Sequence, residues 1–394
     1  MKIFRISAAL LLALLVAGTA YADTARALRI SNRLRFEYDN NVFQTDGDEK
    51  DSFNVYEAIE VALNLNLENT YLGISYRPSF VWYSGRDSGS TDFLNDLDAN
   101  FSQKFGPVVT LGVSEKLRAG QLPAVEDDDY QVRSDDDNVY NSILATLAIQ
   151  MLPATRLDLS GRHVLLKYGE DAHDNDNYRI LVAGATLRQV FGSLTTGFVD
   201  GRYSDTSYFD AEEKFNRDSK TIYAGLGLEQ TFNPKLLGTL RAGFSRREFD
   251  LSDYDDSNNP YADLSISFLP SPATRLTANL GYSIAESSAG NYLSENRLDT
   301  SLHFAHDFTA KITLNASVGY AHSEYDAKYQ LVKAEDGSSS DEDSDRYYAT
   351  ALLAYQVVRN NWLELGWQFV KLDSDVETSY DRNRINLGWR IQLF

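Results

Sequence analysis

Long stretches of the sequence alternate between apolar and polar residues. In residues 53–67 the apolar side chains that share one face of an extended strand are Phe53, Val55, Ile59, Val61, Leu63, Leu65 and Leu67. The same alternation recurs in residues 72–82, 139–151, 222–232, 312–320, 363–369 and 385–391. Such stretches are longer than the roughly 5–6 residues usual for a strand of a soluble sheet. They predict an all-β fold, an antiparallel up-and-down transmembrane β-barrel.

Along the chain, the connections between these stretches alternate between short turns and long loops. Short turns are expected at 69–70, 106–107, 152–154, 192–193, 233–234, 270–273, 309–310 and 359–361. Long loops are expected at 39–51, 84–91, 119–137, 169–176, 204–217, 250–260, 285–292, 326–345 and 373–381. These connections predict about 18 strands, with 16 as the alternative. Short periplasmic turns and long outer loops are typical of bacterial outer-membrane barrels.

The first 22 residues resemble a bacterial secretory signal. Lys2 and Arg5 precede an apolar run from Ala8 to Val16, and Ala20-Tyr21-Ala22 places small residues where a signal peptidase cleaves. A short buried helix is the alternative, but the composition changes abruptly directly after this tripeptide. The sequence therefore predicts a signal peptide over residues 1–22 and an outer-membrane β-barrel over residues 23–394.

Composition and charge exclude several classes of protein. The chain carries 57 acidic and 37 basic side chains, a formal charge of −20, so nucleic acid is not an expected partner. It has no Cys, which excludes disulfides, thiolate metal sites and a Cys nucleophile. We find no Gly-x-Ser-x-Gly, His-Glu-x-x-His or phosphate-binding loop. We therefore expect neither enzymatic activity nor a cofactor.

Most of the acidic side chains lie in the long loops. Two tracts offer hard oxygen ligands of the kind that Ca²⁺ and Mg²⁺ prefer. They are Asp127, Asp128 and Asp129 in one loop and Asp341, Asp343 and Asp345 in another. These tracts either form solvated surface loops or bind divalent cations loosely beside lipopolysaccharide.

Basic side chains are in excess within the strands, and there they must usually face the lumen. A charge on the lipid face costs about 2–4 kcal/mol near the midplane. The parity of the first and last strands points five arginines inward, namely Arg29, Arg33, Arg35, Arg384 and Arg390. Because these two strands pair to close a barrel, the five predict a basic patch that lines the lumen. Alternatively, inward acids such as Glu37, Glu60, Glu68, Asp98 and Asp158 pair with inward arginines and only hold the barrel in shape.

Residues 36–43, with the sequence Phe-Glu-Tyr-Asp-Asn-Asn-Val-Phe, end the first predicted strand. This tract resembles the opening of an outer-membrane β-barrel porin family often found with exopolysaccharide gene clusters. The resemblance implies a barrel through which a secreted polysaccharide, or its fragments, crosses the outer membrane. It brings no catalytic residues with it, and for Asp39, Asn40 and Asn41 we expect turn chemistry at the strand exit.

These observations favour a passive channel in the bacterial outer membrane, and export of a secreted polysaccharide is the main functional prediction. A barrel of 16–18 strands leaves an aqueous lumen unless loops fill it. The alternatives are a general or nutrient-uptake porin and a structural or adhesive surface barrel. Expected partners are outer-membrane lipid, lipopolysaccharide, polysaccharide export components and the barrel-assembly machinery, for which the terminal Phe394 is the expected assembly signal.

Overall fold

The computed structural model describes residues 27–86, 89–120, 137–169, 171–209, 211–251, 254–287, 291–331 and 341–394, and the short segments 126–127 and 130–131. The predicted signal peptide lies outside the described residues. So do Asp128, Asp129 and the side chain of Asp127, so the first of the two acidic tracts is not placed.

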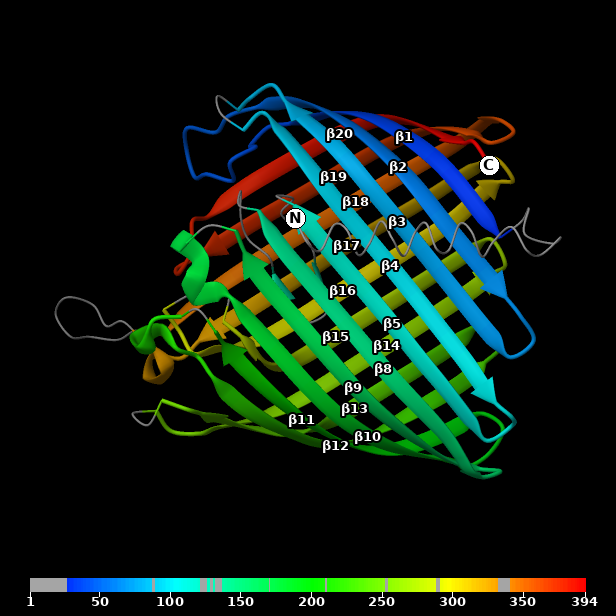
Figure 1. The fold of residues 1–394 in the computed structure, drawn as a ribbon, viewed down its shortest axis with the longest axis vertical. Helices are drawn as coiled ribbons and strands as arrows, with labels where there is room; N and C mark the ends of the chain where they lie inside the picture. The colour runs from blue at the N-terminus through cyan, green and yellow to red at the C-terminus, as the bar shows by residue number, and fades with distance from the viewer. Residues whose placement is uncertain are drawn as a thin grey trace.

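Eighteen strands form one closed antiparallel sheet (Figure 1). They are β1 (Leu28–Asp39), β2 (Ser52–Asn66), β3 (Thr70–Tyr83), β4 (Thr91–Phe105), β5 (Val109–Gly120), β8 (Asn138–Leu152), β9 (Thr155–Tyr168), β10 (Tyr178–Val190), β11 (Thr195–Tyr208), β12 (Ser219–Asn233), β13 (Leu236–Phe249), β14 (Ser257–Ser271), β15 (Thr274–Glu286), β16 (Ser294–Thr309), β17 (Ile312–Tyr325), β18 (Glu342–Val358), β19 (Asn361–Ser374) and β20 (Tyr380–Gln392). Each strand pairs with the next, and β1 pairs with β20. The predicted up-and-down barrel of 18 strands is confirmed.

Side chains on the strands alternate between the lipid and the lumen, as the sequence predicted. Among the outward residues, Leu226 is 67% exposed and Phe244 is 73% exposed. Both lie where a barrel contacts hydrocarbon. The strands are 12 to 17 residues long. At a rise of about 3.3 Å per residue and a tilt of about 45°, this length crosses the roughly 25 Å apolar band of an outer membrane.

The two ends of the barrel differ in their connections. Tight turns join the strands at the end that holds the C-terminus, and Asn360 takes a left-handed conformation with φ of 63° in the turn between β18 and β19. The opposite end holds the long loops, which contain the short 3-10 helices η2 (Asp171–Asp176), η3 (Glu213–Phe215) and η4 (Ala327–Tyr329). None of the described helices is long and apolar enough to cross a membrane.

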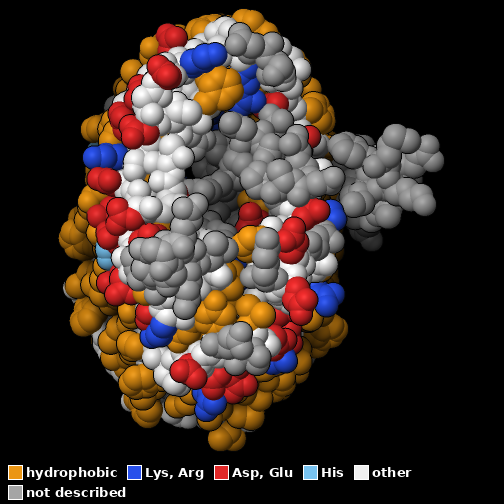
Figure 2. Space-filling view, turned by 90° about the vertical axis from the view of Figure 1, so that its left-hand side faces the viewer, with side chains coloured by type: hydrophobic (Ala, Val, Ile, Leu, Met, Phe, Trp, Pro, Cys, Tyr) orange, Lys and Arg blue, Asp and Glu red, His pale blue; other side chains and the backbone are white. Residues whose placement is uncertain are grey.

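Acidic side chains surround the end with the long loops. Figure 2 looks onto this end and shows Asp and Glu spread around the rim, a depression in the centre and hydrophobic side chains over the outer wall. The hairpin of β6 (Glu126–Asp127) and β7 (Tyr130–Gln131) belongs to the loop between β5 and β8. The predicted arrangement of acidic loops around one mouth is therefore present.

Candidate functional site

The closure of the barrel brings two arginines together on the lumen side. Arg33 of β1 lies directly opposite Arg390 of β20 in the strand register. Glu364 of β19 lies between them, with Oε2 at 2.9 Å from Arg33 Nε and Oε1 at 2.7 Å from Arg390 Nε. The carboxylate is buried and neutralises part of this pair of positive charges. Both guanidinium groups are thereby held against the wall.

The other predicted arginines also face the lumen and have partners there. Arg29 pairs with Glu60 at 2.9 Å, and Arg35 lies 3.6 Å from Glu37 with its guanidinium over the Tyr56 ring. Arg384 donates a hydrogen bond to Gln368. Carboxylates therefore neutralise part of the positive charge of the five arginines. Arg33 and Arg390 share one carboxylate, and Arg384 contacts a neutral amide.

Two residues of this seam were missed by the sequence analysis. Arg382 lies two residues before Arg384 and has the same inward parity, and it pairs with Asp39 at the outer end of β1. Glu364 stands on the polar phase of residues 363–369, so the alternation contained a signal for it. With both included, the seam holds six arginines and four carboxylates, so a positive excess remains.

A hollow of about 480 Å³ lies in the wall beside the seam, and we call it the seam hollow. Arg33 and Arg35 reach it from β1, and Arg275 reaches it from β15. Among the described residues, Arg275 has no carboxylate in ion-pair contact. The volume of the seam hollow is in the range of sites that hold one small molecule.

Neutral polar groups complete the lining of the seam hollow. They are Thr277, His303, Asn315, Ser317, Thr350, Gln368 and Asn386, and Glu364 is the single carboxylate among the described residues of the lining. Guanidinium groups bind carboxylates in a fork geometry, and amides and hydroxyls donate to sugar or alcohol oxygens. The seam hollow can therefore hold a small solute that carries one carboxylate and several hydroxyls.

Elsewhere in the lumen, arginines and carboxylates form rows of ion pairs along the wall. Arg118 pairs with Asp98 at 3.1 Å, Arg188 with Asp158 at 2.7 Å, and Arg241 with Asp200 at 3.3 Å. These rows have the structural role that the sequence analysis gave as its alternative. The seam hollow differs from them because its arginines outnumber its carboxylates.

The outer end of β15 separates from β14 and turns into the lumen, while β16 stays paired with β17 up to Asn296. Pairing between β14 and β15 runs outward from the turn and stops at Ala262 and Tyr282, two residues short of Pro260, which lacks the N–H for a ladder bond. Glu286, at the end of β15, contacts Arg247 of β13, with 2.9 Å between Oε1 and Nη2. Both side chains are buried. This end of the hairpin that β15 forms with β16 therefore passes over the inner face of β13 and β14.

Contacts from β11 and the neighbouring loop hold this inward hairpin in place. Glu286 accepts hydrogen bonds from Thr206 and Tyr208 at 3.2 and 3.1 Å. Arg217, in the loop after β11, donates to the carbonyl of Ser287 at 3.1 Å and pairs with Asp176 of η2 at 2.6 Å. The outer part of the lumen is therefore narrowed on this side by a hairpin locked to the wall.

The motif after the first strand has a structural role. The backbone N–H of Asn41 donates to Asp39 Oδ1 at 3.1 Å, which is the expected turn chemistry. The Asn41 amide donates to the carbonyls of Thr45 and Asp381, and Asn40 Oδ1 accepts from the backbone N–H of Asn383. The motif thus fastens the first loop to the last strand.

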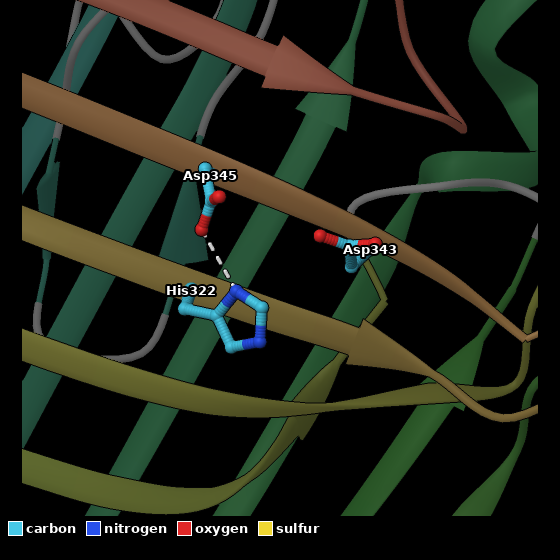
Figure 3. Close-up of side chains that lie close together, drawn as sticks. All are labelled: His322, Asp343 and Asp345. Carbon is cyan, nitrogen blue, oxygen red and sulfur yellow. Dashed lines mark hydrogen bonds and ion pairs between the residues drawn. The ribbon is translucent and has the colours of Figure 1, made fainter.

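The fold brings two of the three aspartates of the second acidic tract close together, and the third, Asp341, lies apart. Asp343 and Asp345 approach His322 of β17, and one ligand atom from each residue lies within 4.8 Å of the others. His322 Nδ1 lies 2.8 Å from Asp345 Oδ1, and Figure 3 shows these two side chains pointing toward each other with Asp343 beside them. Asp341 instead accepts a hydrogen bond from the backbone of Ala327. The sequence analysis missed His322, because only the register of β17 and β18 places it there.

This fold and lumen agree with the comparison against protein families. The profile of the family described as "Putative beta-barrel porin 2" matches residues 169–393, more than half of the chain. The chain belongs to this family. It is therefore a porin of the bacterial outer membrane, in contact with lipid and lipopolysaccharide, and the predicted porin family is confirmed. The motif at residues 36–43 lies outside the matched residues, and the association with exopolysaccharide genes stays a prediction.

Several solved porins resemble the chain at low identity. Pseudomonas aeruginosa OccK2 (OpdF), solved with glucuronate, is 13% identical with a TM-score of 0.48, covering 93% of this chain and 98% of OccK2. OpdK from the same organism is 12% identical (TM-score 0.49, coverage 93% and 99%), and Acinetobacter baumannii OccAB3 is 13% identical (TM-score 0.47, coverage 95% and 100%). No curated protein sequence matches. These values are too low to transfer a solute to this chain.

Proposed function

We propose that this porin is an uptake channel for small hydrophilic solutes that carry a carboxylate. The observation that carries the proposal is the seam hollow, where Arg33, Arg35 and Arg275 face one carboxylate, Glu364. The positive excess in a confined lumen concentrates anions there. The surrounding amides and hydroxyls favour a solute with several oxygen atoms over an apolar one.

The inward hairpin is an argument for small solutes, and against a polymer, as the transported substrate. The Glu286–Arg247 pair and the Arg217–Ser287 bond hold the hairpin over the inner wall, and both involve buried side chains. A polysaccharide in transit would need a continuous wide path, and this hairpin would have to leave the wall to provide one. We therefore favour the uptake alternative over export of a secreted polysaccharide.

The acidic mouth does not prevent passage of anions at physiological salt. Exposed rim carboxylates are screened over about 8 Å at this ionic strength. Charges inside a confined lumen are screened less, because the wall limits the counterions around them. We therefore expect the selectivity to be set at the seam hollow and to weaken as salt rises.

Flux into liposomes that contain the purified porin tests the proposal. Glucose and glucuronate are a matched pair, since they differ mainly by one carboxylate, and dextran represents a polymer. We expect faster entry of glucuronate than of glucose and no entry of dextran. Equal rates for the two sugars, or slower entry of glucuronate, would contradict a carboxylate-selective hollow. Entry of dextran would favour the polysaccharide prediction instead.

A further inference from the structure

Seven neighbouring strands each place one polar side chain on the lipid-facing surface. We call this set the polar stripe, and its residues are Asn32 of β1, Glu57 of β2, Tyr76 of β3, Asn95 of β4, Glu115 of β5, Asn141 of β8 and His163 of β9. These strands lie side by side in the wall (Figure 1). The stripe therefore covers one continuous side of the barrel.

The parity of the strands shows that these residues face outward. Glu57 shares its face with Phe53 and Ile59, which are 46% and 47% exposed. The strand register pairs Asn32 with Ile59, and it pairs both Glu115 and His163 with Ile143, another exposed apolar residue. The polar stripe thus occupies the surface that a barrel turns toward lipid.

Hydrogen bonds link members of the stripe across neighbouring strands. Asn32 Nδ2 donates to Glu57 Oε1 at 3.1 Å, and the Tyr76 hydroxyl donates to Asn95 Oδ1 at 2.7 Å. A carboxylate has room for about four donors, so these bonds leave capacity for a further partner.

A similar bond joins the last part of the stripe. Asn141 Nδ2 donates to Glu115 Oε1 at 3.2 Å, and His163 lies one strand farther along. An amide carries two donors and an imidazole carries a donor or an acceptor on each nitrogen. This part of the stripe therefore offers both donors and acceptors.

The stripe lies within the apolar band and not at its edge. Val55 and Ile59 stand on either side of Glu57 on its face of β2, and Val113 and Leu117 flank Glu115 on β5. Ionisable side chains in hydrocarbon are costly and rare, and they mark a functional surface by default. On a surface in contact with lipid alone, these two carboxylates would only destabilise the folded barrel.

The polar stripe ends sharply at both sides. The next strand after β9 presents Leu181, Ala183 and Ala185 outward, and β20 presents Leu387 and Trp389. Farther around the wall, the register that continues from Leu181 reaches Asp205 of β11, Lys220 of β12 and Glu248 of β13, which face outward near the loop ends of their strands. Apolar residues such as Leu226 of β12 lie deeper. The stripe is therefore bounded by apolar outward residues on β10 and β20, and the outward charges farther around the wall lie toward the loop ends of their strands.

We propose that the polar stripe is the contact surface for a second copy of this chain. The stripe contains carboxylates, amides, a phenol and an imidazole, so donors of one copy can meet acceptors of another. Two copies that face each other would remove both carboxylates from lipid and give them partners. A surface that were only acidic would repel its own copy, whereas this mixture is complementary to itself.

The absence of Cys from the chain allows a direct crosslinking test. Ile143→Cys places one thiol within the stripe, between Glu115 and His163, and Leu226→Cys places one on an apolar part of the wall as the matched control. A bis-maleimide is applied to intact outer membranes. We expect a crosslinked product of twice the chain mass for Ile143→Cys and none for Leu226→Cys. A product that contains a different protein, or equal crosslinking of both variants, would overturn the proposal.

A second measurement uses the mass of the purified porin in mild detergent. We expect wild type to have at least twice the mass of one chain, and the double variant Glu57→Leu/Glu115→Leu to fall to that of one chain. Glu248→Leu, the same change on the outer face of β13, should leave the oligomer intact. An unheated gel confirms that each variant is folded.

A wild-type mass of one chain, or a double variant that stays oligomeric, would contradict the proposal. Neither result depends on the solute that the pore carries.

Discussion

Asp39 and Arg382 form a buried ion pair across the closure of the barrel, although they are 343 residues apart in the sequence. Both carboxylate oxygens of Asp39 lie 3.0 Å from Arg382 Nε, and the two side chains are 0% and 8% exposed. The pair joins the first and last strands at their outer ends, where Asn40 and Asn41 add further bonds. It therefore fastens the seam that closes the sheet.

Removal of this pair should destabilise the barrel. Asp39→Ala leaves a buried guanidinium without its carboxylate, a loss that costs about 3–5 kcal/mol when one partner of a buried pair is removed. The free energy of unfolding in denaturant, followed by gel mobility without heating, measures the effect. Arg246→Gln breaks an exposed, solvent-screened pair with Asp256 and should change the free energy of unfolding far less than Asp39→Ala does. Equal stability of both variants would contradict a role for the pair in closure.

Release of the inward hairpin should widen the mouth. Glu286→Ala removes the carboxylate that contacts Arg247, Thr206 and Tyr208, so the end of β15 loses its attachment to the inner wall. We expect larger and more variable single-channel conductance in planar bilayers. Glu248→Ala, on the outer face of β13, serves as the control. If Glu286→Ala is folded and conducts like wild type, the hairpin does not limit the pore.

The two faces of a strand should tolerate charge very differently. Leu226→Arg places a cation in hydrocarbon at a cost of about 2–4 kcal/mol near the midplane, and we expect less folded barrel in the outer membrane. Asn64→Arg places the same cation on the polar face of β2 and should assemble normally. The amount of heat-modifiable protein in membrane fractions compares them. Equal assembly would show that the assigned faces are wrong.

The His322, Asp343 and Asp345 cluster should bind Zn²⁺ more tightly than Ca²⁺. An imidazole nitrogen together with carboxylate oxygens suits Zn²⁺, whereas Ca²⁺ prefers oxygen ligands alone. The metal needs a neutral imidazole, so binding should weaken as the pH falls and the imidazole takes up a proton. Calorimetry on untagged protein measures it, with His322→Ala as the variant and His303→Ala as the control. Unchanged Zn²⁺ binding by His322→Ala would exclude this site.

The barrel fold could be predicted from the sequence because strand parity and loop length are local properties. Alternation in residues 53–67 and the order of turns and loops are enough to place 18 strands and to decide which arginines face inward. Local periodicity also placed Arg33 and Arg390 in one region, since the first and last strands of any barrel must pair. These features need no knowledge of contacts between distant residues.

Other features depend on register and could not be obtained from parity alone. His322 meets Asp345 only because β17 and β18 pair in one register, and Glu286 reaches Arg247 only because β15 leaves the wall. The polar stripe was present in the alternation, at Glu57 for example, but a single polar residue in an apolar phase is easily overlooked. Only the pairing of neighbouring strands brings the seven residues together into one stripe.

The selectivity of the Arg275→Gln variant tests the central claim most directly. Arg275 lines the seam hollow, and no ion pair with a described residue should be lost with it, so the change should alter charge and leave the fold intact. Arg156→Gln, at an arginine that pairs with Asp158 elsewhere in the lumen, is the control. Reversal potentials are measured in a planar bilayer under a gradient of sodium glucuronate. The account predicts that Arg275→Gln lowers the preference for the anion while Arg156→Gln retains it. A folded Arg275→Gln variant with wild-type selectivity would contradict the assignment of the seam hollow as the solute site.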